Sequence, residues 1–329
     1  MSDLKSETAL IQDAFAPLTL GAEGSYGLRD DVAFLPAQAA GLIVTQDQII
    51  EGTHFLPEDP LPMIARRLVR RNLSDLIAKG GIPTAAFLSL AWPKSRPRSG
   101  IAEFAQGLGA DLYQLCAKCP LMGGDTSETS GHLVASLTMM GTATAKNGQP
   151  VLRSGAKVGD VVAVTGVIGD AWLGLQVRHG LFSRWEAPDC YAFSLAPCPP
   201  TLGMANLIGQ FASAAIDVSD GLIIDAHHLA TASGMNLTLA LDKVPMSEEA
   251  MDFPAFDDPL ERAIVLAIGG DDYQPLITLP PDDFKAYQGA AKKLGVRVTR
   301  IGTCQAGEGV QLSFKGKPVP MPATMGWQI

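Results

Sequence analysis

Three aspartates stand among apolar residues in the stretch AIDVSDGLIID, residues 215–225. They are Asp217, Asp220 and Asp225. An ionised carboxylate in apolar surroundings loses its hydration, and a cation or hydrogen-bond donors must replace the water. A chain with this stretch must therefore either turn the acids out at a surface turn or fold so that positive groups face them.

Apolar runs of strand length alternate with segments of helical spacing along the whole chain. TAAFLSLAWP and HLVASLTMMGTA are typical of strands, whereas residues 61–81 place leucine and isoleucine at helical spacing before a Gly-Gly stop. The turn-rich NGQPVLRSGAKVGD then separates two halves with the same mixture, and the Pro-rich EAPDCYAFSLAPCPP reads as a long loop. We expect an α+β or α/β fold with two domains, residues 1–148 and 149–329.

Composition excludes several classes of partner. The 329 residues carry a net charge of −9 without a basic run, so nucleic acid is not expected to bind. No apolar run approaches the roughly 20 residues of a membrane span, and the first residues lack a signal-peptide pattern. Cys116 and Cys119 form the only CxxC pair among five cysteines, and we interpret them as ordinary core thiols of a cytoplasmic protein.

Other acids also stand where an apolar run meets a turn. Taken singly, each is typical of a turn or a helix cap. Their number favours a shared site, because strand ends at one edge of a sheet converge and Mg²⁺ would relieve the repulsion between their carboxylates. The acids at such junctions are Asp30, Asp31, Asp47, Asp125, Asp217, Asp220, Asp271 and Asp272, and Asp75 lies late in a predicted helix.

Two glycine-rich stretches are compatible with phosphate binding. In MGGDTSETSG, residues 122–131, the glycines would let a phosphate approach the backbone beside Asp125, but the same stretch also fits a hairpin turn. VTGVIGDAWLGL, residues 164–175, places amides at a predicted helix start, where an anion can bind. The chain lacks GxxxxGK[ST], the protein-kinase motifs, HExxH and GxSxG.

Eight segments, in order, resemble the thiamine-monophosphate kinase family, whose superfamily includes aminoimidazole ribonucleotide synthetase. The resemblance runs from about residue 26 to residue 276. The segments are YGLRDDVAFL, TQDQIIEGTHF, NLSDLIAKGGIP, MGGDTS, RSGAKVGD, VTGVIGDAWLGL, IDVSDGLIID and GGDDYQPL.

The resemblance implies a fold, an activity and a set of site residues. An N-terminal domain would bind metal and ATP and pair its sheet with that of a second subunit, and a C-terminal α/β domain would close over the nucleotide. ATP would phosphorylate thiamine monophosphate directly, without a covalent nucleophile. Family positions for Mg²⁺ fall on Asp31, Thr45, Asp47, Asp75, Asp125, Asp217 and Asp220; those for ATP on Gly124, Asp125, Arg153 and Ser219; those for the thiamine phosphate on His54, Asp271 and Trp327.

The chain departs from the family pattern at four positions. Arg29 replaces a glycine, Gln46 a threonine, Asp271 a glutamate and Gln274 a second glutamate. Two alternatives therefore stay open: another ATP-dependent synthetase of the superfamily, or a Mg²⁺-nucleotide sensor without turnover. A selenophosphate synthetase would need a reactive cysteine near the N-terminus, whereas the first cysteine here is Cys116.

Overall fold

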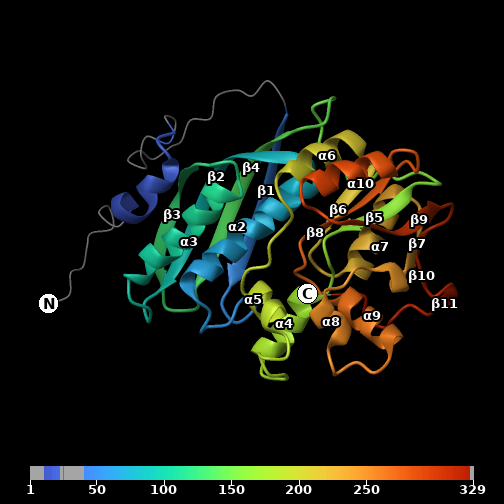
Figure 1. The fold of residues 1–329 in the computed structure, drawn as a ribbon. Coiled ribbons are helices and arrows are strands. Elements are labelled where there is room, and N and C mark those ends of the chain that lie inside the picture. The colour runs from blue at the N-terminus through green and yellow to red at the C-terminus, as the bar shows by residue number, and fades with distance from the viewer. Residues whose placement is uncertain (1–10, 23–24, 26–40, 327–329) are drawn as a thin grey trace. The chain divides into compact units, whose positions relative to one another are not determined.

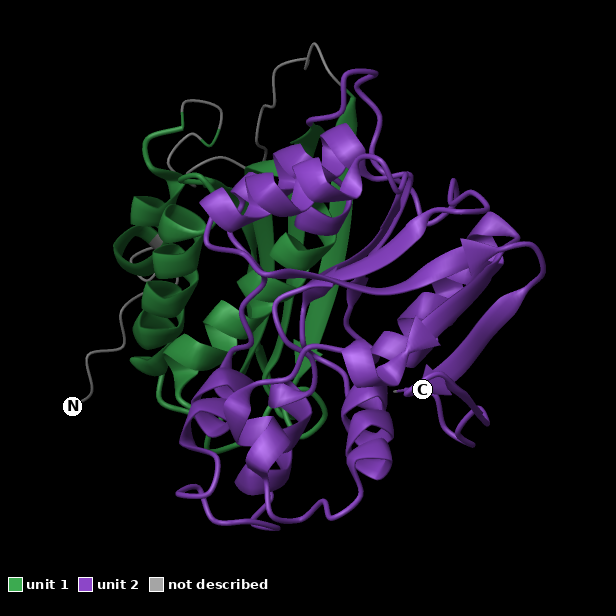
Figure 2. Cartoon of the chain, turned by 45° about the vertical axis from the view of Figure 1, so that its right-hand side comes forward, with its two compact units in different colours: residues 1–76, 82–143 green, residues 77–81, 144–329 purple. Residues whose placement is uncertain are grey.

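The computed structural model describes residues 11–22, 25 and 41–326 (Figure 1). The chain divides into two compact units (Figure 2). The first comprises Met1–Leu76 with Ile82–Ala143, and the second Ile77–Gly81 with Thr144–Ile329.

The first unit is built on a four-stranded sheet in the order β1-β4-β2-β3. Figure 1 shows α2 and α3 along one face of this sheet. Its strands are β1 (Leu42–Ile50), β2 (Gly81–Pro93), β3 (Leu121–Thr129) and β4 (Val134–Ala143). Its helical segments are η1 (Ile11–Phe15), η2 (Ala16–Thr19), α2 (Leu61–Ala78) and α3 (Gly100–Gln114).

Alternation of side chains decides which face of this sheet is buried. Along β4, Ala135, Leu137 and Met139 are buried, and the residues between them are half-buried. On the neighbouring edge strand, Leu42 and Val44 remain 46% and 53% exposed. Because successive strand residues point to opposite faces, one face carries the core and the other leaves apolar side chains uncovered.

The second unit contains a seven-stranded sheet in the order β11-β10-β7-β9-β5-β8-β6. Most neighbours are antiparallel, and β10 with β7 is parallel. The strands are β5 (Val161–Thr165), β6 (Ala214–Val218), β7 (Asn236–Ala240), β8 (Gln274–Leu279), β9 (Val298–Gln305), β10 (Gly309–Phe314) and β11 (Lys317–Val319). The helices are α4 (Asp170–Arg178), α5 (Pro188–Leu195), α6 (Gly203–Phe211), α7 (Leu222–Ser233), η4 (Leu241–Lys243), α8 (Glu248–Asp252), α9 (Pro259–Ile268) and α10 (Phe284–Lys293).

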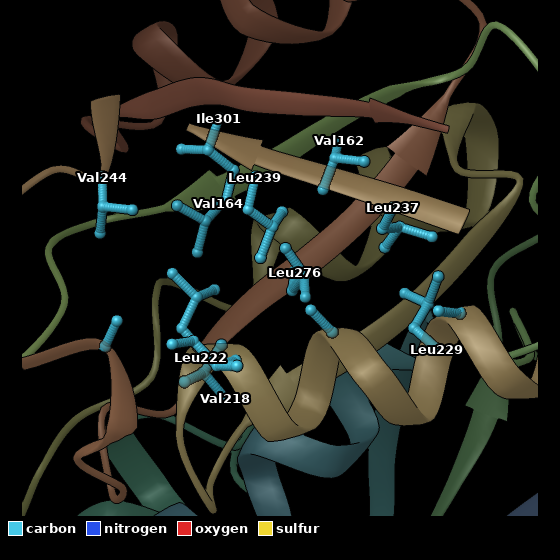
Figure 3. Packing of buried hydrophobic residues seen from close by; sticks show 14 of the residues in the cluster. Val162, Val164, Val218, Leu222, Leu229, Leu237, Leu239, Val244, Leu276 and Ile301 are labelled. Carbon is cyan, nitrogen blue, oxygen red and sulfur yellow. The ribbon is translucent and has the colours of Figure 1, made fainter. Parts of the chain in front are cut away.

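Helices on both faces bury the central strands of this sheet. Figure 3 shows Leu222 and Leu229 of α7 packed against strand residues that include Leu237 and Leu276. On the other face lie α6 and α10 (Figure 1), which meet through Phe211 and Tyr287 with ring centroids 5.9 Å apart. Every residue of β5, β6 and β8 is therefore buried, which explains their nearly continuous apolar sequence.

Two expectations about local structure were wrong. The segment expected to be a loop contains α5, whose first turn is capped when the amides of Asp189 and Cys190 donate to Glu249, 3.1 and 2.9 Å away. This cap lies 59 residues further along the chain, so local patterns do not reveal it. The hairpin interpretation of residues 122–131 also fails, because most of this stretch lies in β3.

The CxxC pair belongs to the core of the first unit. Cys116 and Cys119 follow α3 and are both buried. Burial raises the pKa of Cys119 to about 12, which keeps its reactive thiolate form scarce at neutral pH. Among the described residues, no helix is long and apolar enough to cross a bilayer.

Candidate functional site

Three loops of the second unit meet at one end of three neighbouring strands of its sheet. β8 runs antiparallel to β5 and to β6, so the amino end of β8 lies beside the carboxyl ends of its two neighbours. The loops at this edge are residues 166–169, 219–221 and 269–273. Ligand sites in sheets with helices on both faces commonly form at such an edge.

The loop after β6 is shaped around the carboxylate of Asp225. The backbone amides of Ser219, Asp220 and Gly221 donate to Asp225 Oδ2 at 3.0, 3.0 and 3.1 Å. Burial, followed by the charges of Asp217 and Asp220, raises the pKa of Asp225 to about 8, although the amides act in the opposite direction. This arrangement holds Ser219 and Asp220 in a fixed loop at the start of α7.

Asp271 is held against the same loop. Its amide donates to Ser219 O at 2.8 Å, and the amide of Tyr273 donates to Val218 O at 2.8 Å. The Tyr273 hydroxyl donates to Asp271 Oδ1 at 2.8 Å, which orients the carboxylate. Four predicted site residues thus share this sheet edge: Asp217, Ser219, Asp220 and Asp271.

Asp272 has a different role from its neighbour. Its side chain is fully buried, and the Gly169 amide donates to Oδ1 and Oδ2 at 3.0 and 2.9 Å. The Ala171 amide also donates to it, so this carboxylate caps the start of α4. Burial raises its pKa well above the ordinary value. Asp272 therefore points into the protein, and its inclusion among the candidate ligands was wrong.

Arg153 and His228 lie beside the loop after β6. Arg153 is exposed, and its carbonyl accepts a hydrogen bond from Ser233 Oγ at 2.9 Å. Partial burial, followed by the charge of Arg153, lowers the pKa of His228. Ligand atoms of Asp220, Asp225 and His228 all lie within 4.8 Å of one another. His228 is exposed and lies three residues after Asp225, so both are on one face of α7.

In the first unit, three predicted metal residues lie between β1 and α2. Thr45 and Asp47 pair with the buried Met139 and Leu137, so both point to the helix-covered face. Thr45 Oγ1 donates to Asp75 Oδ2 at 2.5 Å, and Arg71 Nη2 lies 3.4 Å from Asp47 Oδ1. The carboxylates of Asp47 and Asp75 thus flank the same strand segment.

Asp125 is not brought to those residues within one chain. It lies on β3, at the opposite edge of the four-stranded sheet from β1. Three strand spacings of about 4.8 Å separate these edges by roughly 14 Å. Asp125 also pairs with the exposed Ser89, so it points to the face that the helices leave uncovered.

Gly124 has a structural requirement of its own. Its φ is +157°, and a Cβ there would lie 1.9 Å from Leu88 O of the neighbouring strand. The absence of a side chain therefore lets β2 and β3 approach, whatever else binds nearby.

Of the other residues predicted to bind the thiamine phosphate, His54 lies among the described residues and Trp327 does not. His54 lies in the turn after β1, where Nδ1 accepts a hydrogen bond from the Ile50 amide at 3.1 Å. Near the C-terminus, Gly326 packs closely on Asp220 and Ile224, since a Cβ there would lie 2.5 Å from Asp220 O. Asp31 and Trp327, together with Arg29, fall outside the described residues.

Comparison with known proteins identifies the family. Residues 29–143 match the model for "AIR synthase related protein, N-terminal domain", and residues 157–315 match its C-terminal counterpart. Thiamine-monophosphate kinase of Caulobacter vibrioides is 38% identical over 323 residues, covering 94% of this chain and 87% of the relative. The chain belongs to the thiamine-monophosphate kinase family. The enzyme of Salmonella typhimurium is 35% identical, with 92% of this chain and 90% of the relative covered.

Solved structures support membership of the thiamine-monophosphate kinase family. The enzyme from Stenotrophomonas maltophilia K279a superposes with a TM-score of 0.82 at 30% identity, covering 94% of this chain and 97% of that one. A structure described as "AaThiL complexed with AMPPCP and TMP" gives 0.75 at 30% identity, with 91% and 90% covered. The hydrogenase maturation protein HypE reaches 0.76 at 17% identity, a likeness of fold alone.

Proposed function

We propose that this chain transfers the terminal phosphoryl group of ATP to thiamine monophosphate, forming thiamine diphosphate. The observation that carries the proposal is the 38% identity, over 94% of the chain, to a thiamine-monophosphate kinase. A structural relative at 30% identity holds AMPPCP, an ATP analogue, and TMP together. ATP is therefore the co-substrate and thiamine monophosphate the acceptor.

The oxygen ligands at the two sheets fit Mg²⁺. Thr45, Asp47 and Asp75 supply hydroxyl and carboxylate oxygens in the first unit, and Asp217 and Asp220 supply carboxylates in the second. Mg²⁺ prefers such ligands and retains waters that a phosphate can displace. Asp31 and Asp125 complete the proposed set. Because this set and the nucleotide are both anionic, EDTA is expected to abolish ATP binding in calorimetry, and tight metal-free binding would contradict the proposal.

Catalysis rests on alignment and charge. The acceptor oxygen of thiamine monophosphate is already ionised, so transfer requires no strong general base. Gly124, Asp125, Arg153 and Ser219 are proposed to contact ATP, and His54, Asp271 and Trp327 the thiamine phosphate. Bound Mg²⁺ would neutralise charge at the phosphates, while these residues would hold donor and acceptor in line.

The proposed functional form is a homodimer joined through the first unit. Both β1 and β3 are edge strands, and unpaired edges need a partner or cover. Pairing β1 with β3 of a second copy would cover both edges and place that copy's Asp125 beside β1. Residues 1–148 would then supply metal binding and dimerisation, and residues 149–329 the domain that closes over the nucleotide.

Gln46, which replaces a threonine of the family pattern, gives no support to the alternative of a Mg²⁺-nucleotide sensor without turnover. Gln46 is exposed, and its side-chain Nε2 donates to Ser136 Oγ at 3.2 Å. It lies between Thr45 and Asp47, so it points to the opposite face of β1 and leaves the proposed ligands in place.

One assay tests the activity. Purified protein is incubated with ATP, Mg²⁺ and thiamine monophosphate, and thiamine diphosphate is followed by chromatography. Product formation is expected in the protein and not in Asp220→Asn. ATP binding without product would instead identify a sensor, and a product from another acceptor would identify a different synthetase of the superfamily.

A further inference from the structure

A histidine stands beside two carboxylates at the start of α7. Asp225 and His228 are three residues apart on the helix, so their side chains share one face. Asp220 approaches from the preceding loop, and one ligand atom from each residue lies within 4.8 Å of the other two. Among the described residues, no other group of three or more histidine, cysteine or acidic side chains is gathered this closely.

We propose that Asp220, Asp225 and His228 form a binding site for one divalent transition-metal ion, such as Mn²⁺. Two ligand atoms each about 2.1 Å from an ion lie at most about 4.2 Å apart. Three atoms 4.8 Å apart lie about 2.8 Å from their common centre, so the observed spread requires side-chain movements of up to about 0.7 Å. His228 is exposed and can move by this amount without disturbing the core.

The loop around the cluster is rigid enough to hold the two acids. Three backbone amides donate to Asp225 Oδ2, so the ion would take the other carboxylate oxygen, Oδ1. Gly221 has φ +133°, and a Cβ there would lie 2.7 Å from Ile268 O. Close packing on Gly270 and Gly326 holds the same loop from two further segments, since a Cβ at either residue would lie 2.5 Å from its backbone carbonyls.

The ligand chemistry distinguishes this site from the magnesium positions proposed above. Two carboxylates balance the charge of a divalent ion, and an imidazole nitrogen suits transition metals better than Mg²⁺, which prefers oxygen. Asp220 is shared with the proposed magnesium set, so His228 would decide which ion occupies this position. The inference does not depend on kinase activity, because all three ligands come from the second unit and binding needs neither substrate.

Pulsed electron paramagnetic resonance of Mn²⁺ bound to the full chain tests the site without ATP or thiamine monophosphate. A ¹⁴N coupling from a histidine ligand is expected in the protein. It should vanish in His228→Asn, with Mn²⁺ binding at this site weakened about tenfold or more. The matched control is His227→Asn, because His227 lies about 100° around the helix and should leave the coupling unchanged.

Each alternative result would overturn the site. Absence of a ¹⁴N coupling in the unmodified protein would show that Mn²⁺ binds oxygen alone. A coupling that survives in His228→Asn would assign the nitrogen to another of the five histidines. Full displacement by Mg²⁺ at equal concentration would remove the proposed selectivity. Because the spectrum is recorded without substrates, the ¹⁴N coupling can be measured in every variant, including those that lose kinase activity.

Discussion

At the scale of single residues, neighbouring acids in GGDDY have opposite roles. Asp271 faces the proposed substrate site with its carboxylate oriented by Tyr273, whereas Asp272 is buried as a helix cap. Both Asp271 and Tyr273 have positive φ, 67° and 53°, so the backbone reverses sharply around the buried acid. The cap thereby fixes the conformation that presents Asp271.

Asp271→Ala is expected to raise the KM for thiamine monophosphate far more than the KM for ATP. A hydrogen bond to a charged group contributes about 1.5–3 kcal/mol, which corresponds to roughly a ten- to hundredfold change. Steady-state kinetics with each substrate varied in turn measures both constants. If the KM for ATP rises and that for thiamine monophosphate does not, the acceptor pocket has been misplaced.

Asp272→Asn is expected to change how stability depends on pH. The pKa of Asp272 is raised in the folded protein, so between its unfolded and folded values the folded state binds more protons. Its contribution to stability is therefore fully present below the unfolded pKa and falls as pH rises, by up to about 1.4 kcal/mol per pH unit. Asparagine keeps an acceptor for the Gly169 amide and does not titrate.

Urea unfolding of both proteins at about pH 4 and about pH 8 tests this dependence. The free energy of unfolding of wild type relative to Asp272→Asn should decrease between the two conditions. Comparing the two proteins cancels the titration of all other groups to first order. An unchanged difference would mean that Asp272 keeps its ordinary pKa in the folded protein.

At the scale of elements, the close approach of β2 and β3 gives a structural reason for Gly124, which the sequence analysis assigned to ATP binding. Gly124→Ala would place a Cβ 1.9 Å from Leu88 O and separate β2 from β3. Strain and overpacking together should lower the free energy of unfolding by about 2 kcal/mol or more. The matched control is Gly131→Ala, because a Cβ there meets only Thr129 Oγ1 at 3.6 Å.

Thermal and urea denaturation of these two variants separates folding from nucleotide binding. Gly124→Ala should melt earlier even without ATP, whereas Gly131→Ala should match the unmodified protein. Equal stability of both variants would restore a purely ligand-binding reason for Gly124.

For the assembly, the two edge strands of the first sheet, together with its uncovered apolar face, predict self-association. Light scattering should give twice the 34.6 kDa mass of the chain. Val44 is 53% exposed on β1, so Val44→Lys should weaken the dimer by placing charge at an apolar interface. Val158 is 62% exposed in the second unit, and Val158→Lys should leave the mass unchanged. A monomer at micromolar concentration in the unmodified protein would contradict this assembly.

Local patterns were sufficient for most of the elements. The strands predicted for TAAFLSLAWP and HLVASLTMMGTA and the helical segment within residues 61–81 lie close to where their spacing placed them. Periodicity predicts such elements because burial of one face acts over neighbouring residues. The short helices α5, α6 and α8 and the strands β3, β10 and β11 escaped prediction. The cap that begins α5 comes from a distant glutamate.

Composition, spacing and the order of motifs along the chain were sufficient to predict the fold class and the family, and they supplied the residues that are proposed to bind phosphate and metal. The packing of the chain separates the roles of two adjacent acids, because Asp271 is half-buried with its carboxylate held by Tyr273, whereas Asp272 is fully buried. It also set Asp125 at the sheet edge opposite Asp47 and gathered His228 with two aspartates. Strand order and helix packing join residues far apart in sequence, and no local pattern encodes that pairing.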